Sequence, residues 1–280
     1  MNTGTIKVIP TSGLANRLRV IAFSIRLARE SNKQLIIYWH ADKYLNSEFS
    51  DLFEMPGNIT VNKLPLSYKV WLRSGKLSAR LNRIRNWYLR QFKFDFIFLD
   101  RMANEVWKNR LNLQKEVDKA RNVLICSCQE INHFNLSDYQ QFIPVPNIQN
   151  KINDQVIQFK PDIIGIHIRT TDNAESIKNS PFHLFVKKIE EELRMNEDAT
   201  FFLATDNEGY QNQLIEKFGT DKILFYKKEF RRELNQGIKD AVVDLFCLAK
   251  TSKIYGSYFS SFSDVAGRIG QIPVVVMKGN

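Results

Sequence analysis

The sequence predicts an α/β protein in which helices cover parallel sheets. Apolar, β-branched segments alternate with segments of helical periodicity near both ends of the 280-residue chain, and short turns join them. This alternation favours parallel strands, because each crossover helix packs back on the sheet. With 44% apolar and 12% aromatic residues, the chain can bury a sizeable core.

The first fifty residues read as strand, turn, helix and strand. Residues 5–10 and 34–40 are apolar runs, and residues 16–31 carry apolar side chains at near-helical spacing. The turn TSGLANR places a glycine between strand and helix, where backbone N–H groups can approach an anion. The spacing alone favours an ordinary turn capped by Asn16.

The second half repeats the alternation more regularly. Ser180 is the expected N-cap of its first long helix, with Pro181 in the first turn. In doubly wound sheets ligands bind beyond the carboxyl ends of the strands. The predicted strands are 162–168, 200–205, 222–226, 253–257 and 272–277, and the predicted helices are 181–195, 207–218, 237–250 and 261–269.

The middle of the chain is less regular. NVLICSC at 122–128 reads as one more strand of the first half. The segment 142–151 holds two prolines and few core residues, so a domain joint is expected near 145–160. We therefore divide the chain into an N-terminal domain, residues 1–150, and a C-terminal domain, residues 151–280.

Basic residues are concentrated in residues 64–94, which hold eight Lys or Arg and no acidic residue, against a net charge of +10. We predict a basic helical insertion there. Basic helices with interfacial aromatics attach to anionic membranes, and a solvated helix whose aromatics pack into the first domain is an equal alternative. The patch also suits an acidic polysaccharide. Its aromatics are Trp71, Trp87, Tyr88, Phe92 and Phe94.

Cysteine content and hydropathy argue against several protein classes. Cys126, Cys128 and Cys247 follow no repeated spacing, so we expect small core residues in a reducing compartment and neither disulfides nor a zinc site. The sequence has no run of about 18 apolar residues, and its polar N-terminus is unlike a signal peptide. A cytoplasmic protein is expected.

Polar side chains follow the strand at 162–168. Arg169 comes first, and Asp172 and Glu175 come next. An arginine fork binds phosphate through two hydrogen bonds, and a nearby carboxylate can take a proton from an incoming hydroxyl. A surface Arg–Asp pair, worth under about 1 kcal/mol, is the alternative. His167 precedes Arg169 within the strand, where a core histidine is the usual finding.

Three later segments add polar groups. Thr205 and Asp206 end the next strand, and Asp206 could equally cap the following helix. Asp244 interrupts the apolar face of helix 237–250, which is costly without a partner. The N1–H and N2–H₂ edge of guanine would be such a partner, and so would a nearby lysine. GSYFSSFSDVAG at 256–267 offers hydroxyls and helix N–H groups that suit phosphate oxygens.

These segments together resemble a known family. GIHIRTTDN, FLATDN, DLFCLAK and GSYFSSFSDVA, in that order, are similar to the fucosyltransferase superfamily. It includes core α-1,6- and Nod-factor fucosyltransferases and, more distantly, α-1,2- and protein O-fucosyltransferases. SGLANRLR resembles the first strand–helix turn of that superfamily. The resemblance covers residues 11–50 and 162–277 and is weak over 60–150.

The resemblance implies a GT-B architecture, in which two Rossmann-like, doubly wound domains face a cleft. It implies that the N-terminal domain lies on the acceptor side and that the C-terminal domain binds the nucleotide sugar. The implied reaction is a metal-independent, inverting transfer of fucose from GDP-fucose to a glycan hydroxyl, without a cofactor. We expect a bacterial-type surface polysaccharide or a lipid-linked oligosaccharide as acceptor. Residues 64–94 would then hold a peripheral enzyme at the inner membrane face.

The resemblance also assigns residues. It places Arg169 at the β-phosphate, His167 and Asp244 at the guanine, and Asn16 near the sugar. Where the core α-1,6 enzymes have HVRRTDK, residues 167–173 read HIRTTDN. The base therefore stays open between two carboxylates, and the sugar stays open as well. The full donor-binding set is Asn16, His167, Arg169, Thr205, Asp206, Asp244, Ser260, Ser261 and Phe262, and the catalytic set is Arg169, Asp172 and Glu175.

Two other functions are kept as alternatives. One is a transferase that uses another nucleotide sugar. The other is a nucleic-acid-binding protein whose electrostatic footprint is the basic stretch 64–94. Since no recognised nucleic-acid motif accompanies that stretch, no nucleic-acid partner is expected.

Overall fold

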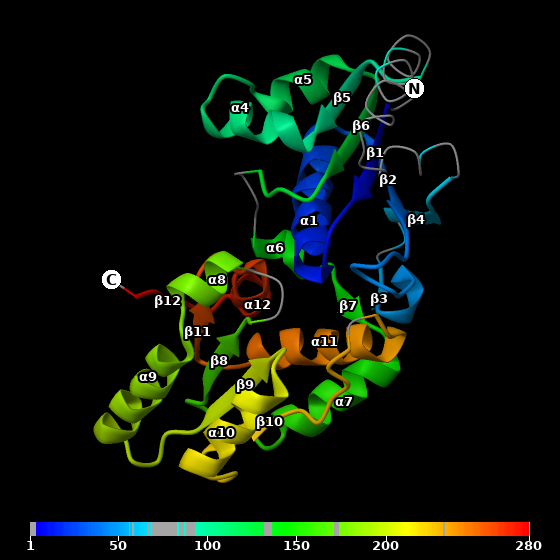
Figure 1. Cartoon of the computed structure of the whole chain (residues 1–280). Coiled ribbons are helices and arrows are strands. Elements are labelled where there is room, and N and C mark those ends of the chain that lie inside the picture. The colour runs from blue at the N-terminus through cyan, green and yellow to red at the C-terminus, as the bar shows by residue number, and fades with distance from the viewer. Residues whose placement is uncertain are drawn as a thin grey trace. The chain divides into compact units, whose positions relative to one another are not determined.

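A computed structural model describes residues 4–55, 57, 59–65, 68, 83, 87, 93–131, 136–170, 174–231 and 233–279. The chain divides into two compact units, Met1–Ile143 and Pro144–Asn280. Each unit contains a five-stranded sheet in which neighbouring strands run parallel (Figure 1). The predicted α/β class and the Rossmann-like character of both units are confirmed.

The first unit has the strand order β4-β2-β1-β6-β5. Helix α1 follows β1 after a short turn and packs on β1 and β2, because Leu18, Ile21 and Ile25 form one buried stripe. The strands are β1 (Thr5–Pro10), β2 (Gln34–Trp39), β3 (Phe53–Glu54), β4 (Ile59–Lys63), β5 (Phe96–Leu99) and β6 (Asn122–Ser127), and the helices are α1 (Leu14–Glu30), α4 (Ala103–Trp107), α5 (Leu113–Lys119) and α6 (Leu136–Tyr139). In the described part of this unit, Phe49–Asp51 and Asp100–Met102 are 3₁₀ turns.

The second unit has the strand order β10-β9-β8-β11-β12. Its strands are β8 (Ile164–Ile168), β9 (Phe201–Thr205), β10 (Ile223–Phe225), β11 (Lys253–Ser257) and β12 (Val274–Met277). The chain adds strands on one side of β8 as far as β10 and then returns to add β11 and β12 on the other side. This reversal creates a topological switch point at the carboxyl ends of β8 and β11, which is where such sheets bind ligands.

Helices cover both faces of the second sheet. Ile166, Leu203, Phe185 and Leu214 belong to a buried cluster that joins one face to α9 and α10. Gly165 faces the opposite way, toward the Leu248 side chain of α11. The helices of this unit are α7 (Pro146–Val156), α8 (Ala174–Asn179), α9 (Phe182–Met195), α10 (Glu208–Phe218), α11 (Asn235–Leu248) and α12 (Ser261–Gly270), and β7 (Ile143–Pro144) lies at the boundary between the units.

The boundary between the units lies between residues 143 and 144, whereas the sequence places it after residue 150. The physical reason is α7, which occupies the expected joint. Pro146 starts this helix, and Ile148 and Ile152, one turn apart, are buried as α7 packs against α11. Residues 146–156 are therefore a helix of the second unit, and their prolines begin it instead of marking a linker.

Ser180 is not the N-cap of α9, because Pro181 occupies that position. The Ser180 hydroxyl donates to the carbonyl oxygen of Met277 and accepts the Tyr258 N–H at 2.7 Å. These bonds tie the start of α9 to β12 and to the turn after β11, which belongs to the candidate site below.

Most of the basic stretch 64–94, and with it the predicted helical insertion, lies outside the described residues. At its ends, Tyr68 and Phe94 are buried in a cluster of the first unit with Ile9 and Leu124. Phe94 therefore packs into the first unit, as the alternative interpretation expects, whereas Trp87 is 61% exposed. Within the described ranges, no helix combines the length and apolarity needed to cross a bilayer.

Candidate functional site

The carboxyl edge of the second sheet brings most of the predicted residues together. Arg169 follows β8, Asp206 follows β9, and the turn 258–260 follows β11 and leads into α12. Because β8 and β11 flank the switch point, the guanidinium and the start of α12 belong to the same ligand-binding position of a doubly wound sheet.

Arg169 and Asp206 form an ion pair with unequal exposure. The Arg169 Nη1 atom lies 3.2 Å from Asp206 Oδ2, and the Arg169 side chain is 21% exposed, against 10% for Asp206. Asp206 Oδ1 accepts the backbone N–H and the hydroxyl of Thr170 at 2.9 and 3.0 Å. The carboxylate thus fixes the chain after β8 and orients the guanidinium.

Asp206 does not cap α10. The cap is Asn207, whose Oδ1 accepts the Tyr210 N–H at 3.1 Å. Thr205 is buried at the end of β9, and its hydroxyl oxygen accepts the Asn207 N–H at 3.2 Å. Thr205 therefore shapes the strand end, while Asp206 acts on Arg169.

His167 is buried in β8, and its ring stacks on that of Phe262 with centroids 4.8 Å apart. Its Nδ1 atom lies 3.3 Å from Ser263 Oγ. Burial, followed by the charge of Arg169, lowers the pKa of His167 to about 3. The imidazole is therefore neutral at physiological pH, and with Phe262 it forms a flat, uncharged surface.

Asp244 is buried in α11 and pairs through Oδ2 with the ammonium group of Lys228, whose side chain is 5% exposed. The lysine that the sequence offered as an alternative partner is therefore present. Asp244 Oδ1 is nevertheless buried without a hydrogen-bond partner in the described part of the chain. Burial raises the pKa of Asp244 to about 6, and the charge of Lys228 opposes this rise.

Asp244 lies at the level of His167. Helix α11 runs antiparallel to β8, and Leu248 packs against Gly165. Asp244, one helical turn earlier, is therefore nearer the carboxyl edge, as His167 is on the strand. The charge of Lys228 is among those that lower the pKa of His167, which agrees with this placement.

The turn after β11 opens α12 toward the switch point. The Ser257 hydroxyl oxygen accepts the Arg169 N–H at 3.0 Å, so this turn is joined directly to the end of β8. Ser260 is the N-cap residue of α12 and Ser261 its first residue. A Cβ at Gly256 would lie 2.5 Å from Ser263 Oγ, so only glycine lets α12 pack this close to β11. The first N–H groups of α12 favour an anion.

Two carboxylates near Arg169 are candidates for the base. Glu175 is exposed in α8, where its Oε2 accepts the Asn179 amide at 3.2 Å. Asp172 lies outside the described residues.

In the first unit, Asn16 does not cap α1, because Gly13 is the N-cap residue. The Asn16 amide donates to Ser12 Oγ at 2.9 Å, and Ser12 has a left-handed φ of 71°. Asn16 therefore fastens the turn after β1 from within the first turn of α1.

The neighbouring Arg17 is completely buried. Its guanidinium donates to the carbonyl oxygens of Ser12 at 2.8 Å and His40 at 2.5 Å, and to Asp42 Oδ2 at 2.8 Å. Burial lowers the pKa of Arg17 to about 10, although Asp42 opposes this shift. Burial also raises the pKa of Asp42, but bonds and charges from His40 and Arg17 outweigh it and leave that pKa below its usual value.

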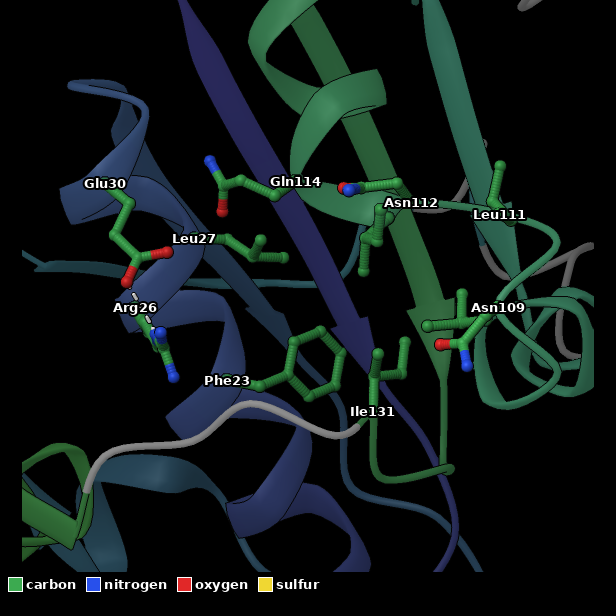
Figure 2. Close-up of a pocket in the computed structure, with 11 residues that line it drawn as sticks. Phe23, Arg26, Leu27, Glu30, Asn109, Leu111, Asn112, Gln114 and Ile131 are labelled. Carbon is green, nitrogen blue, oxygen red and sulfur yellow. Dashed lines mark hydrogen bonds and ion pairs between the residues drawn. The ribbon is translucent and has the colours of Figure 1, made fainter.

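A separate cavity of about 380 Å³ lies in the first unit between α1 and the α4–α5 connection (Figure 2). Side-chain amides of Asn109, Asn112 and Gln114 line it, together with apolar side chains such as Phe23. It opens along the second half of α1, whereas Asn16 lies in the first turn. The cavity is therefore distinct from the turn that the sequence singled out.

The described residues hold no group of three or more His, Cys, Asp and Glu side chains placed to bind a metal ion. Cys126 and Cys128 are half-buried, Cys247 is buried, and all three are free thiols. Burial, reinforced by Asp100, raises the pKa of Cys128 to about 11, so this thiol is unreactive at neutral pH.

No protein-family profile and no curated protein matches the sequence. By structure, the chain resembles NodZ α-1,6-fucosyltransferase soaked with GDP-fucose, with a TM-score of 0.65 and 15% identity over 99% of this chain and 97% of that one. It also resembles mutant FUT1 of Arabidopsis thaliana in complex with GDP, with a TM-score of 0.60 and 14% identity over 99% of this chain and 71% of that one. A third similar structure is POFUT1 in complex with GDP-fucose, with a TM-score of 0.59 and 13% identity over 98% of each chain. The chain thus has the GT-B-like fold of these fucosyltransferases, and the predicted resemblance is confirmed at that level.

Proposed function

We propose that the chain is a glycosyltransferase that moves fucose from GDP-fucose to a hydroxyl of a glycan. The observation that carries the proposal is the meeting of a partly exposed guanidinium, a helix N-terminus and a buried carboxylate with an unsatisfied oxygen at one sheet edge. Solved structures of the same fold, NodZ and POFUT1, were obtained with GDP-fucose.

The diphosphate is assigned to Arg169 and the start of α12. A guanidinium remains charged at any physiological pH and can donate two parallel hydrogen bonds to phosphate oxygens. Asp206 orients it, and the Arg169 side chain is 21% exposed, so a ligand can reach it. Ser260 and Ser261 contribute hydroxyls beside the first N–H groups of α12.

The guanine is assigned to Asp244, His167 and Phe262. Asp244 Oδ1 is an acceptor without a partner in the described chain, and the N1–H and N2–H₂ groups of guanine are donors. The stacked rings of His167 and Phe262 provide an uncharged surface for a flat base. Asn16, in the first unit, is kept as a candidate for the sugar.

The reaction proposed is a single displacement with inversion. The acceptor oxygen forms a bond to C1 of fucose while the bond from C1 to the β-phosphate oxygen breaks, and GDP leaves with the electron pair. Fixed positive charge from Arg169 and the N–H groups of α12 stabilises the departing phosphate, which is the task a metal would otherwise perform. The hydroxyl proton passes to a carboxylate, for which Asp172 and Glu175 are both retained.

The acceptor is proposed to be a surface polysaccharide or a lipid-linked oligosaccharide on the cytoplasmic side of a membrane. Exposure of Trp87 within the basic stretch supports peripheral attachment, because aromatic side chains anchor basic segments at the lipid–water interface. Flotation with vesicles rich in anionic lipid tests this part. A chain that stays unbound at low salt would contradict it.

Donor choice tests the function itself. Purified protein is incubated with GDP-fucose, GDP-mannose or UDP-glucose in EDTA, and release of free nucleotide is followed with and without a panel of glycans. Of the three donors, we expect only GDP-fucose to release free nucleotide, and we expect the release to be faster when the correct glycan is present. Release from a different donor would instead establish a transferase for another nucleotide sugar.

A further inference from the structure

The segment between β10 and α11 is held against α11 by two carboxylates one helical turn apart. Asp240 accepts the Tyr226 hydroxyl and the Glu229 N–H, each at 3.0 Å. Asp244, four residues later, binds Lys228 from the same segment. A Cβ at Gly237 would lie 2.1 Å from the Arg231 carbonyl oxygen, so the backbone of the segment lies directly on the first turns of α11.

Stability alone does not account for the Lys228–Asp244 pair. Removing two charges from water is costly, and the cost is recovered only when the remaining hydrogen-bonding positions are satisfied. Here Asp244 Oδ1 stays buried without a partner in the described chain. Asp240 shows the contrast, since both of its oxygens accept hydrogen bonds from the segment. An unsatisfied acceptor beside a fixed ammonium group is suited to a ligand.

We propose that Lys228 is a specificity-determining residue that recognises the carbonyl oxygen at position 6 of a purine base, while Asp244 accepts the adjacent N1–H. This inference rests on the proposed function and adds a residue to the base site. It predicts a nucleoside diphosphate with a keto purine as the ligand.

The order of donors and acceptors supports this assignment. Lys228 and Asp244 present a donor beside an acceptor, and the guanine edge presents an acceptor, O6, beside a donor, N1–H. Adenine carries an amino group at position 6. This group is a donor and would face another donor, the ammonium group of Lys228. The diphosphate at Arg169 fixes the direction in which the base enters, so adenine cannot reverse its edge to fit.

Access to Asp244 also involves Lys228. Because Asp244 Oδ1 is buried, a base that reaches it must displace the groups that cover this atom. The Lys228 Nζ atom lies 5.4 Å from the centre of the Phe230 ring, so its charge has a second favourable contact within the same segment. Phe230 thus helps to hold the Lys228 ammonium group beside Asp244.

The test is a calorimetric comparison of GDP, IDP and ADP in the full-length chain. IDP keeps the carbonyl and N1–H of guanine but lacks its amino group, so it isolates the contact assigned to Lys228. The variant is Lys228→Met, and the matched control is Lys227→Met, at the exposed neighbour. We expect Lys228→Met to lower the affinities for GDP and IDP by the same factor, about 10-fold or more, which is the range for loss of a hydrogen bond to a charged group. The affinity for ADP should not change. Lys227→Met should leave all three affinities as in the wild type.

Two further measurements separate loss of the Lys228 donor from other effects of the substitution. Titration at about pH 7 and about pH 8.5 separates loss of the donor from protonation of Asp244, because only the second effect recovers at higher pH. If Lys228→Met fails to fold, Lys228→Gln decides the question, because its side-chain amide offers both a donor and an acceptor and should lower the GDP-to-ADP affinity ratio. A folded variant at position 228 with the wild-type GDP-to-ADP affinity ratio overturns the role of Lys228 but leaves the proposed function standing. A wild-type chain that binds no GDP overturns the proposed function as well.

Discussion

The two units place an arginine after an equivalent strand and use it in opposite ways. Arg17 lies in the first turn of α1, beyond β1, is completely buried, and donates to two carbonyl oxygens and to Asp42. Arg169 follows β8, is 21% exposed, and pairs with Asp206. In the first unit the cation is enclosed by its own chain, and in the second unit it stands at the switch point.

We therefore use solvent access, and not position near a strand end, to distinguish the structural Arg17 from Arg169, the residue proposed to bind the ligand. Enclosure lowers the pKa of Arg17 to about 10, because burial disfavours the charged form. Its donors fix the left-handed turn at Ser12. We therefore assign the diphosphate to the second unit, whereas Arg17 supports a turn of the first unit.

Replacing Arg17 should give the largest effect. Arg17→Met removes the buried guanidinium that donates to Asp42 and to two carbonyl oxygens, and we expect a loss of about 3–5 kcal/mol in the free energy of unfolding. Urea unfolding measures this loss. Arg26→Met, at a partly exposed position of the same helix, is the control and should cost under about 1 kcal/mol. A similar cost for both variants would remove the contrast between the two arginines.

Replacing Arg169 should act on turnover more than on stability. Arg169→Ala removes fixed positive charge from the departing phosphate, and we expect kcat to fall about 100- to 1000-fold. Arg194→Ala, at an exposed position in α9, controls for loss of one surface charge and should leave kcat unchanged. The measurement is GDP release from GDP-fucose with acceptor present. An unaltered kcat in folded Arg169→Ala would exclude this residue from the mechanism.

The raised pKa of Asp244 predicts a dependence of donor binding on pH. Burial raises this pKa to about 6, so the carboxylate accepts N1–H above that pH and is protonated below it. Affinity for GDP-fucose should therefore fall about tenfold for each pH unit below about 6. His167, with a pKa of about 3, stays neutral over this range.

Asp244→Asn is the matched variant for the pH experiment, because an amide does not titrate. Its affinity should be lower than that of the wild type at neutral pH and flat between about pH 5 and 7. Equal slopes in the two proteins would assign the titration to another group.

The smallest expected effect concerns stacking. Phe262→Leu removes the ring that stacks on His167, and GDP affinity should fall about three- to tenfold, equivalent to about 0.5–1.5 kcal/mol. Phe182→Leu loses a comparable stack with Tyr210, from α9, and serves as the control. The control should affect stability and leave GDP affinity unchanged. If Phe262→Leu binds GDP as tightly as the Phe182→Leu control, Phe262 does not contact the base.

Sequence reasoning places the strands of the second half within two residues at each end, because they are short apolar runs with clear turn residues between them. It misses β4, whose ITVNK sequence is polar and exposed at a sheet edge. It also misses α7, whose prolines resemble those of a linker. Helix α7 forms because it packs against α11, and this tertiary contact leaves no local pattern in the sequence.

The cap predictions fail for one shared reason. Ser180, Asp206 and Asn16 each have good local capping chemistry, yet each is bound elsewhere and another residue takes the cap. Their actual partners are Met277, Thr170 and Ser12. Local propensity cannot weigh a cap against a stronger partner that the fold supplies.

The candidate site could be predicted where its residues follow strands, and not where they come from other segments. Arg169 and Asp206 are visible because a polar run interrupts an apolar one. Lys228 lies among several cations in YKKEFRRE and has no distinguishing local signal. Its role depends on Asp244, which is 16 residues away in the chain.

Calorimetric titration of GDP into the wild-type chain and Arg169→Ala, in EDTA, measures whether the second unit holds a guanosine diphosphate through Arg169. We expect the wild type to bind one GDP per chain at micromolar affinity, about −8 kcal/mol, and the variant to lose at least about 100-fold in affinity. A folded wild-type chain that takes up no GDP at millimolar concentration, or a variant that binds GDP as well as the wild type, would contradict this expectation.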